Sequence, residues 1–143
     1  MDQIRSLHLF AALSDAQFDA LKAKSKTVVL EKSQSLFKMG DDAPYFFVLT
    51  EGAIKLALNS PQGVEKVLMI MRPYELFAEA VMFMEKSQYP VNAVAIEPCT
   101  AICFDSKLLV SFLRSSPDLS LKMLSMLSMR LHRLVNEIET LPS

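Results

Sequence analysis

Six short runs of apolar, β-rich sequence, each bounded by turn residues, occupy the chain between Thr27 and Asp105. They span residues 27–31, 45–50, 53–59, 64–71, 91–96 and 99–105. Turn-forming segments separate them, among them Gly40-Asp41-Asp42, Glu51-Gly52 and Ser60-Pro61-Gln62-Gly63. Many short strands joined by hairpin turns are typical of a barrel or jelly roll. The pattern therefore predicts that an antiparallel β-roll forms the centre of the molecule.

Helical sequence flanks the β-rich region on both sides. Residues 6–25 have helical spacing and are expected to form a cap, with Ser14 as the N-cap of its second part. After the last run, Asp105 or Ser106 can cap a short helix. Ser116-Pro117 then places a cap before a proline at the first position of a long helix. The predicted fold class is α+β, mainly β.

The long helix carries a regular apolar stripe. Its members recur at alternating steps of three and four residues and are Leu124, Leu127, Leu131, Leu134, Ile138 and Leu141. This spacing is that of the a/d seam of a coiled coil, and Pro142 ends it. The helix has a second apolar face in Leu119, Met123 and Met126. Because two apolar faces need two partners, we expect a parallel homodimer; the alternative is that the stripe packs on the barrel.

Composition limits the classes of function. The 143 residues, about half of them hydrophobic, suffice for one compact domain and hardly two. Lys and Arg are spread along a chain of net charge −1, so the chain by itself should not hold DNA well. There is no nucleophile with a base partner, no H-E-x-x-H spacing and no glycine-rich phosphate loop, so an enzyme is not expected.

The sequence also indicates where the protein works. It contains no apolar run of membrane-spanning length and no charged-then-apolar leader, so we expect a cytoplasmic protein without a membrane partner. Cys99 and Cys103 are its two cysteines. In a strand they would lie about 13 Å apart on one face, beyond disulfide reach. We expect reduced core thiols.

Residues 74–91, Y-E-L-F-A-E-A-V-M-F-M-E-K-S-Q-Y-P-V, resemble the phosphate-binding cassette of the Crp/Fnr transcription regulators. Members that bind cyclic nucleotides have Gly, Glu, Arg and a small hydroxyl residue there. The resemblance places Ala78, Glu79, Tyr89 and Pro90 at these positions, so only the carboxylate remains. A buried cyclic phosphate without a cation would cost several kcal/mol, and we therefore expect no cyclic nucleotide.

The resemblance covers essentially the whole chain, with further similar segments at residues 36–42, 45–55 and 63–68. It implies that residues 1–116 form a cyclic-nucleotide-binding-like sensor β-roll with helical caps, continuous with a long dimerisation helix over 117–143. In the family a winged helix-turn-helix follows that helix. Since the chain stops at Ser143, we expect a sensor fragment or a stand-alone sensor. It would meet DNA and RNA polymerase only through a missing C-terminal domain.

Further positions distinguish the branches of the family. Leu134 and Val135 stand where cyclic AMP receptors have a Thr-Ser pair that touches adenine, a second argument against a nucleotide. No cysteine precedes Cys99, which excludes the iron-sulfur centre of the Fnr branch. The histidine ligand of the CO-sensing branch is replaced by Ala80. The remaining branch is that of the Dnr-type regulators of nitrate respiration, which are taken to sense nitric oxide through haem. Residues 77–85 and 130–141 are similar to it.

Haem needs an apolar slot and an axial ligand. The candidate ligands are His8 and His132, although His8 can equally be a partly exposed cap residue and His132 a solvated residue between two arginines. The expected effector pocket comprises Ala78, Glu79, Met82, Tyr89, Pro90, Leu134 and Val135. Two alternatives stay open: a small organic effector oriented by Glu79, and a ligand-free dimerisation domain in which Glu79 only caps a turn.

Overall fold

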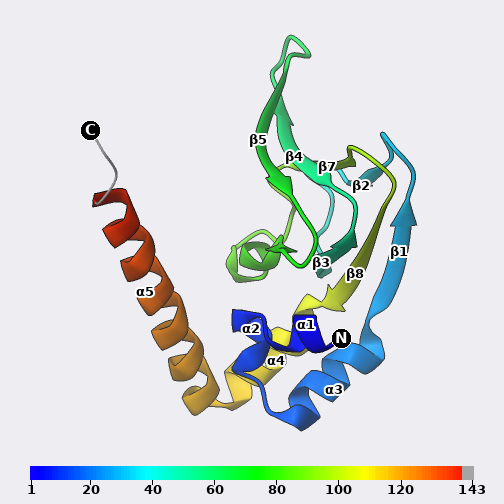
Figure 1. Cartoon of the computed structure of the whole chain (residues 1–143). Helices are drawn as coiled ribbons and strands as arrows, with labels where there is room; N and C mark the ends of the chain where they lie inside the picture. The colour runs from blue at the N-terminus through cyan, green and yellow to red at the C-terminus, as the bar shows by residue number, and fades with distance from the viewer. Residues whose placement is uncertain (140–143) are drawn as a thin grey trace.

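The computed structural model describes residues 1–139, and its centre is a β-roll of two four-stranded antiparallel sheets (Figure 1). The strand orders are β1-β8-β3-β6 and β2-β7-β4-β5. The strands are β1 (Lys26–Leu30), β2 (Ser35–Phe37), β3 (Tyr45–Glu51), β4 (Ile54–Asn59), β5 (Glu65–Met71), β6 (Leu76–Phe77), β7 (Asn92–Ala95) and β8 (Cys99–Asp105). The six predicted runs are confirmed to within one residue at each end. The short strands β2 and β6 were not predicted, because two or three residues are too few to show an alternating pattern.

The side chains of β3 and β8 alternate between two cores. Phe47 and Cys103 face the interior of the roll, whereas Phe46 and Phe104 face the helices. Both cysteines are buried and free, as expected. The helical core centres on Phe10, whose ring lies 4.8 Å from that of Phe104 and 6.0 Å from that of Phe46. This second core attaches the helical cap to the outer face of one sheet.

The helices are α1 (Asp2–Arg5), α2 (His8–Ala11), α3 (Asp15–Lys24), the 3₁₀ helix η1 (Glu79–Phe83), α4 (Ser106–Ser115) and α5 (Pro117–Glu139). The predicted N-cap of α3 is confirmed: the Gln17 N–H donates to Ser14 Oγ, and Gln17 Oε1 accepts from the Ser14 N–H. At α4 and α5 a single bond caps each helix: the Leu108 N–H donates to Asp105 Oδ1, and the Leu119 N–H donates to Ser116 Oγ. The N-terminal cap is three short helices that begin at Asp2, four residues earlier than predicted.

Helix α5 begins against the body of the protein, and its C-terminal half projects away from it (Figure 1). Leu119 and Met123 are buried, and all residues from Leu127 to Glu139 are exposed. The predicted seam therefore lies open within this chain, with Leu131 63% and Ile138 68% exposed. Leu141 and Pro142 fall outside the described residues. No helix within residues 1–139 is long and apolar enough to span a membrane.

Candidate functional site

Helix η1 and the turn before it stand between the β-roll and α5. Ala78, immediately before η1, has φ 65° and ψ 11°, a left-handed conformation that glycine adopts more easily than alanine. It occupies the position at which the sequence comparison with cyclic-nucleotide binders expects glycine. Val81 is buried and anchors η1 on the roll. The backbone frame of the cassette is thus present without its phosphate-binding side chains.

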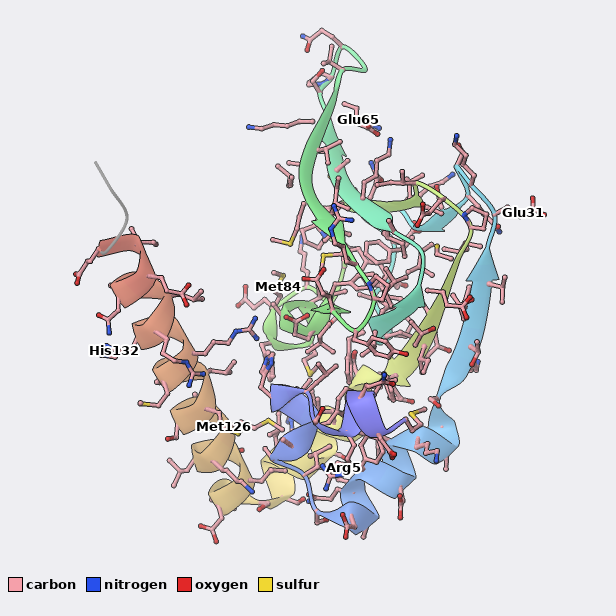
Figure 2. The ribbon with its side chains drawn as sticks, viewed as in Figure 1. Arg5, Glu31, Glu65, Met84, Met126 and His132 are labelled. Atoms are coloured by element: carbon pink, nitrogen blue, oxygen red, sulfur yellow. The ribbon has the colours of Figure 1, made fainter. Side chains whose placement is uncertain are left out.

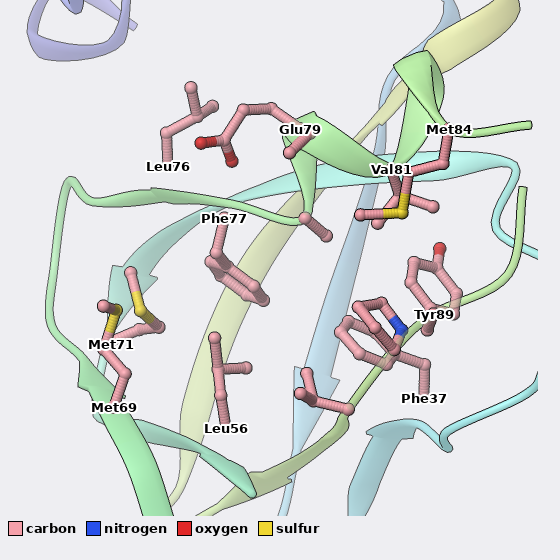
Figure 3. A pocket seen from close by; sticks show the side chains of 14 residues that line it. Phe37, Leu56, Met69, Met71, Leu76, Phe77, Glu79, Val81, Met84 and Tyr89 are labelled. Carbon is pink, nitrogen blue, oxygen red and sulfur yellow. The ribbon is translucent and has the colours of Figure 1, made fainter.

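A cavity of about 230 Å³ opens between η1 and the strands of the roll (Figure 3). We call it the β-roll cavity. Its walls include Phe37, Leu56, Met69, Met71, Met84 and Tyr89. Of the described residues that line it, Glu79 is the one with a charged side chain, so an anion bound here would meet no cation.

Tyr89 takes the place of the phosphate-binding arginine and forms part of the wall. Its ring stacks on Phe37 with centroids 3.8 Å apart and planes 14° apart. Its hydroxyl donates a hydrogen bond of 2.9 Å to the Tyr45 carbonyl oxygen. Burial raises the pKa of Tyr89 to about 12, so the hydroxyl stays neutral. The tyrosine is therefore a fixed, uncharged aromatic surface.

A second cavity, of about 360 Å³, lies between α2, η1 and α5. We call it the interhelical cavity. Its lining is mainly apolar and includes Leu9, Met82, Phe83, Met123 and Leu127, with His8 and Glu79 as the ionisable members. Glu79 thus lines both cavities.

The charged groups at this cavity influence one another. Arg130 Nη1 lies 2.9 Å from Nδ1 and 3.0 Å from Nε2 of His8. Burial, and then the Arg130 charge, lower the pKa of His8 below the 6.5 of a free histidine, so its ring is neutral near pH 7. Burial raises the pKa of Glu79, and the Arg130 charge partly opposes that rise. Arg130 is consequently the cation close to both groups.

The predicted site residues separate into three places. Ala78, Glu79, Tyr89 and Pro90 line the β-roll cavity. Met82 and His8 line the interhelical cavity instead.

The remaining predicted residues lie on the exposed half of α5. Leu134 and Val135 are 47% and 44% exposed and line neither cavity, so their place in a pocket stays a prediction that requires a second copy of the chain. His132 is exposed, and Figure 2 shows it on the side of α5 that faces away from the roll. Sequence reasoning missed Arg130, because a contact with a residue 122 positions away leaves no local pattern.

A β-roll with a phosphate-cassette frame and a projecting C-terminal helix defines the effector-sensing domain of the Crp/Fnr class of transcription regulators. The chain belongs to this class: residues 27–116 match the cyclic nucleotide-binding domain family. The crystal structure of the sensor domain of the transcriptional regulator DNR from Pseudomonas aeruginosa is similar with a TM-score of 0.83 and 37% identity, covering 99% of this chain and 95% of that one. A crystal structure of DNR from the same organism is similar with a TM-score of 0.90 and 37% identity, covering 97% of this chain and 61% of that one.

A curated relative broadens the comparison. A CRP-like cAMP-activated global transcriptional regulator of Mycobacterium tuberculosis is 25% identical over 142 residues, which are 99% of this chain and 63% of the relative. The chain thus spans less than two thirds of that regulator. Both this relative and DNR are transcriptional regulators.

Proposed function

We propose that the chain is the sensing and dimerising part of a Crp/Fnr-type regulator that responds to nitric oxide through haem and controls denitrification-type genes. The observation that carries this proposal is that His8 lies in the wall of a mainly apolar cavity to which the long helix contributes Met123 and Leu127. The similarity to the DNR sensor domain supports it, since the Dnr-type resemblance of the sequence implies haem and nitric oxide.

The residues of the interhelical cavity fit a haem group by their chemistry. Apolar side chains such as Leu9, Met123 and Leu127 would hold the macrocycle, and the imidazole of His8 would bind the iron. Bound haem would supply an iron with a coordination position for a diatomic gas. The β-roll cavity has no histidine among its described lining residues and is smaller, so we assign haem to the interhelical cavity.

Arg130 connects occupancy of this cavity to the long helix. Because its guanidinium lies against both ring nitrogens of His8, His8 becomes free as a ligand only when Arg130 moves away. The Arg130 charge acts on the pKa of Glu79, so the Glu79 carboxylate is near enough to be an alternative partner for the displaced guanidinium. An effector that binds only when Arg130 is displaced from His8 would shift the population of α5 from the arrangement with this contact to the arrangement without it. A switch of this kind requires such a difference in affinity.

The exposed seam supplies the dimerisation part of the proposal. Leu124, Leu131 and Ile138 are each at least 60% exposed on one chain, at heptad spacing. Burying such a stripe against a second copy would form a parallel coiled coil. The shift of α5 would then pass to the DNA-binding domains that follow this helix in the family.

Hemin titration of the purified chain tests the haem assignment, followed by absorption spectra of the ferrous form with and without nitric oxide. We expect saturable uptake of one haem per chain and a Soret band that shifts in His8→Ala. His132→Ala is the matched control, since His132 lines neither cavity. Weak, non-saturating uptake indifferent to both substitutions would exclude haem. A spectral change in His132→Ala alone would identify His132, on α5, as the residue that binds the iron.

A further inference from the structure

A cleft of about 370 Å³ lies beside α4 and shares no lining residue with the β-roll cavity. We call it the α4 cleft. Ala43, Pro44, Met82 and Ser87 form part of its wall. Helix α4 forms the rest with residues that recur at the spacing of one helix face, namely Ser106, Lys107, Val110, Ser111 and Arg114.

Two cations of α4 line this cleft without a carboxylate to balance them. Lys107 and Arg114 are exposed, and no acidic side chain is among the described residues that line the cleft. Within residues 1–139 neither cation forms an ion pair. The carboxylate at the start of the helix, Asp105, already accepts from the Leu108 N–H and pairs with Lys24. The positive charge of the cleft is therefore available to an anion.

A buried hydroxyl group lies next to Lys107 in the chain. Ser106 is 6% exposed and lines the cleft. Its backbone N–H donates to the Pro44 carbonyl oxygen at 3.0 Å, but its hydroxyl makes no hydrogen bond within residues 1–139. Since no enclosed side-chain oxygen of these residues lacks a partner, the hydroxyl reaches open space, and the cleft is the space that Ser106 lines. A buried hydroxyl left unpaired at a cleft indicates a ligand that accepts a hydrogen bond.

The spacing of the two cations suits a ligand with two negative groups. Lys107 and Arg114 are seven residues apart, which is a rise of about 10.5 Å along the helix axis. Val110 lies between them on the same face, and Met82 of η1 adds a second apolar side chain. A compact anion would require both long side chains to bend toward one point. Two carboxylates joined by an aliphatic chain match the two charges and the apolar surface between them.

We propose that the α4 cleft binds an aliphatic dicarboxylate. One carboxylate pairs with Lys107 and accepts from the Ser106 hydroxyl, and the other accepts two parallel hydrogen bonds from the planar guanidinium of Arg114. The aliphatic chain lies against Val110 and Met82. The site does not depend on haem. Met82 also lines the interhelical cavity, so a ligand in the α4 cleft contacts a residue in the wall of that cavity.

Adipate is a suitable probe, because it carries two carboxylates on an unbranched aliphatic chain. We would titrate it into the purified chain by isothermal titration calorimetry at low ionic strength, since salt screens exposed charges. We expect saturable binding of one adipate per chain. Hexanoate, with a chain of the same length and one carboxylate, should bind roughly tenfold more weakly because it leaves one cation unpaired. Inorganic phosphate, a compact anion, should also bind more weakly than adipate.

Three variants test the assigned residues. Lys107→Gln and Arg114→Gln change exposed side chains, so the fold should persist, and each should weaken adipate binding roughly tenfold. Ser106→Ala removes the unpaired hydroxyl and should weaken binding by a similar factor. Lys122→Gln is the matched control, because it removes an exposed cation of α5 that does not line the cleft, and it should leave binding unchanged.

Absence of saturable binding would overturn the proposal, as would hexanoate or phosphate binding as tightly as adipate. Equal weakening by Lys107→Gln and Lys122→Gln would also overturn it, since net charge alone would then account for the affinity. If Ser106→Ala fails to fold by circular dichroism, the two cation variants decide the test.

Discussion

Arg130 on α5 and His8 on α2 are 122 positions apart in the chain, yet Arg130 Nη1 lies 2.9 Å from Nδ1 of His8. This contact joins the exposed half of α5 to the helical cap. The apolar contacts of α5 with the body lie earlier in the helix, at Leu119 and Met123. The orientation of the distal part of α5 therefore depends on a polar contact that ligand binding can compete for.

Arg130→Ala should loosen α5 without unfolding the domain. An exposed polar contact of this kind contributes about 0–1 kcal/mol, so global stability should change little. Amide hydrogen exchange over residues 124–139 should become faster. Arg133→Ala removes an exposed arginine of the same helix and is the control. Equal exchange in the wild type and both variants would show that Arg130 does not restrain the helix.

Leu131→Asp should prevent the proposed homodimer. Leu131 is 63% exposed in the single chain, so the substitution leaves the monomer fold intact while placing a charge in the seam. Light scattering after size exclusion should give a monomer for Leu131→Asp and a dimer for the wild type. Ser125→Asp, exposed on the same helix but outside the seam, should remain dimeric. A dimeric Leu131→Asp would locate the interface elsewhere.

Glu79→Gln should stabilise the domain at neutral pH. Burial raises the pKa of folded Glu79 above the 4.5 of a free glutamate, so the folded state binds this proton more tightly than the unfolded state. The free energy of unfolding therefore falls as pH rises from 4.5 through the folded pKa. Urea unfolding between pH 4 and 7 should show the advantage of Glu79→Gln growing with pH and vanishing near pH 4. Glu85→Gln, exposed two residues beyond η1, is the control, and a pH-independent difference would contradict the assignment.

Phe10→Ala should destabilise the domain by about 3–5 kcal/mol, the usual cost of removing a fully buried phenylalanine. Phe10 is 0% exposed, and its ring contacts Phe18, Phe46 and Phe104. Urea denaturation measures the change. Phe83→Ala, at a 62% exposed position, should alter stability by about 0.5 kcal/mol or less. Similar losses for both variants would mean that the helical core contributes less than its burial indicates.

Cys103 should react slowly with a thiol reagent in the folded chain. Burial raises its pKa to about 11, and burial likewise raises the pKa of Cys99. Since the thiolate is the reactive form, both thiols should react far more slowly with an aromatic disulfide reagent than free cysteine does. Adding urea should expose both at once. Rapid reaction of one thiol in the native state would reveal local opening of β8.

Much of the fold follows from local sequence. The strand runs and the capping residues Ser14, Asp105 and Ser116 are confirmed in their predicted places, whereas the dimer seam on α5 stays a prediction. Each depends on residues close in sequence, whose spacing shows directly which face is apolar or which backbone group is capped. The strands β2 and β6 were not predicted, because they are defined by pairing with distant strands and not by a pattern in their own residues.

The site was predictable only in part. Ala78, Glu79, Tyr89 and Pro90, which the cassette resemblance grouped together, line one cavity, and their role in binding an effector stays a prediction. The resemblance also grouped Met82 with them, whereas Met82 lines the interhelical cavity.

By itself, therefore, the sequence determined the β-roll class, the heptad spacing of the apolar stripe and the loss of phosphate-binding side chains, because those properties belong to neighbouring residues. Only the tertiary structure decided that Glu79 borders both the β-roll cavity and the interhelical cavity, and that Arg130 contacts His8. These relationships depend on how α2, η1 and α5 pack around shared apolar surface. Such packing joins residues far apart in the chain, and no local spacing encodes it.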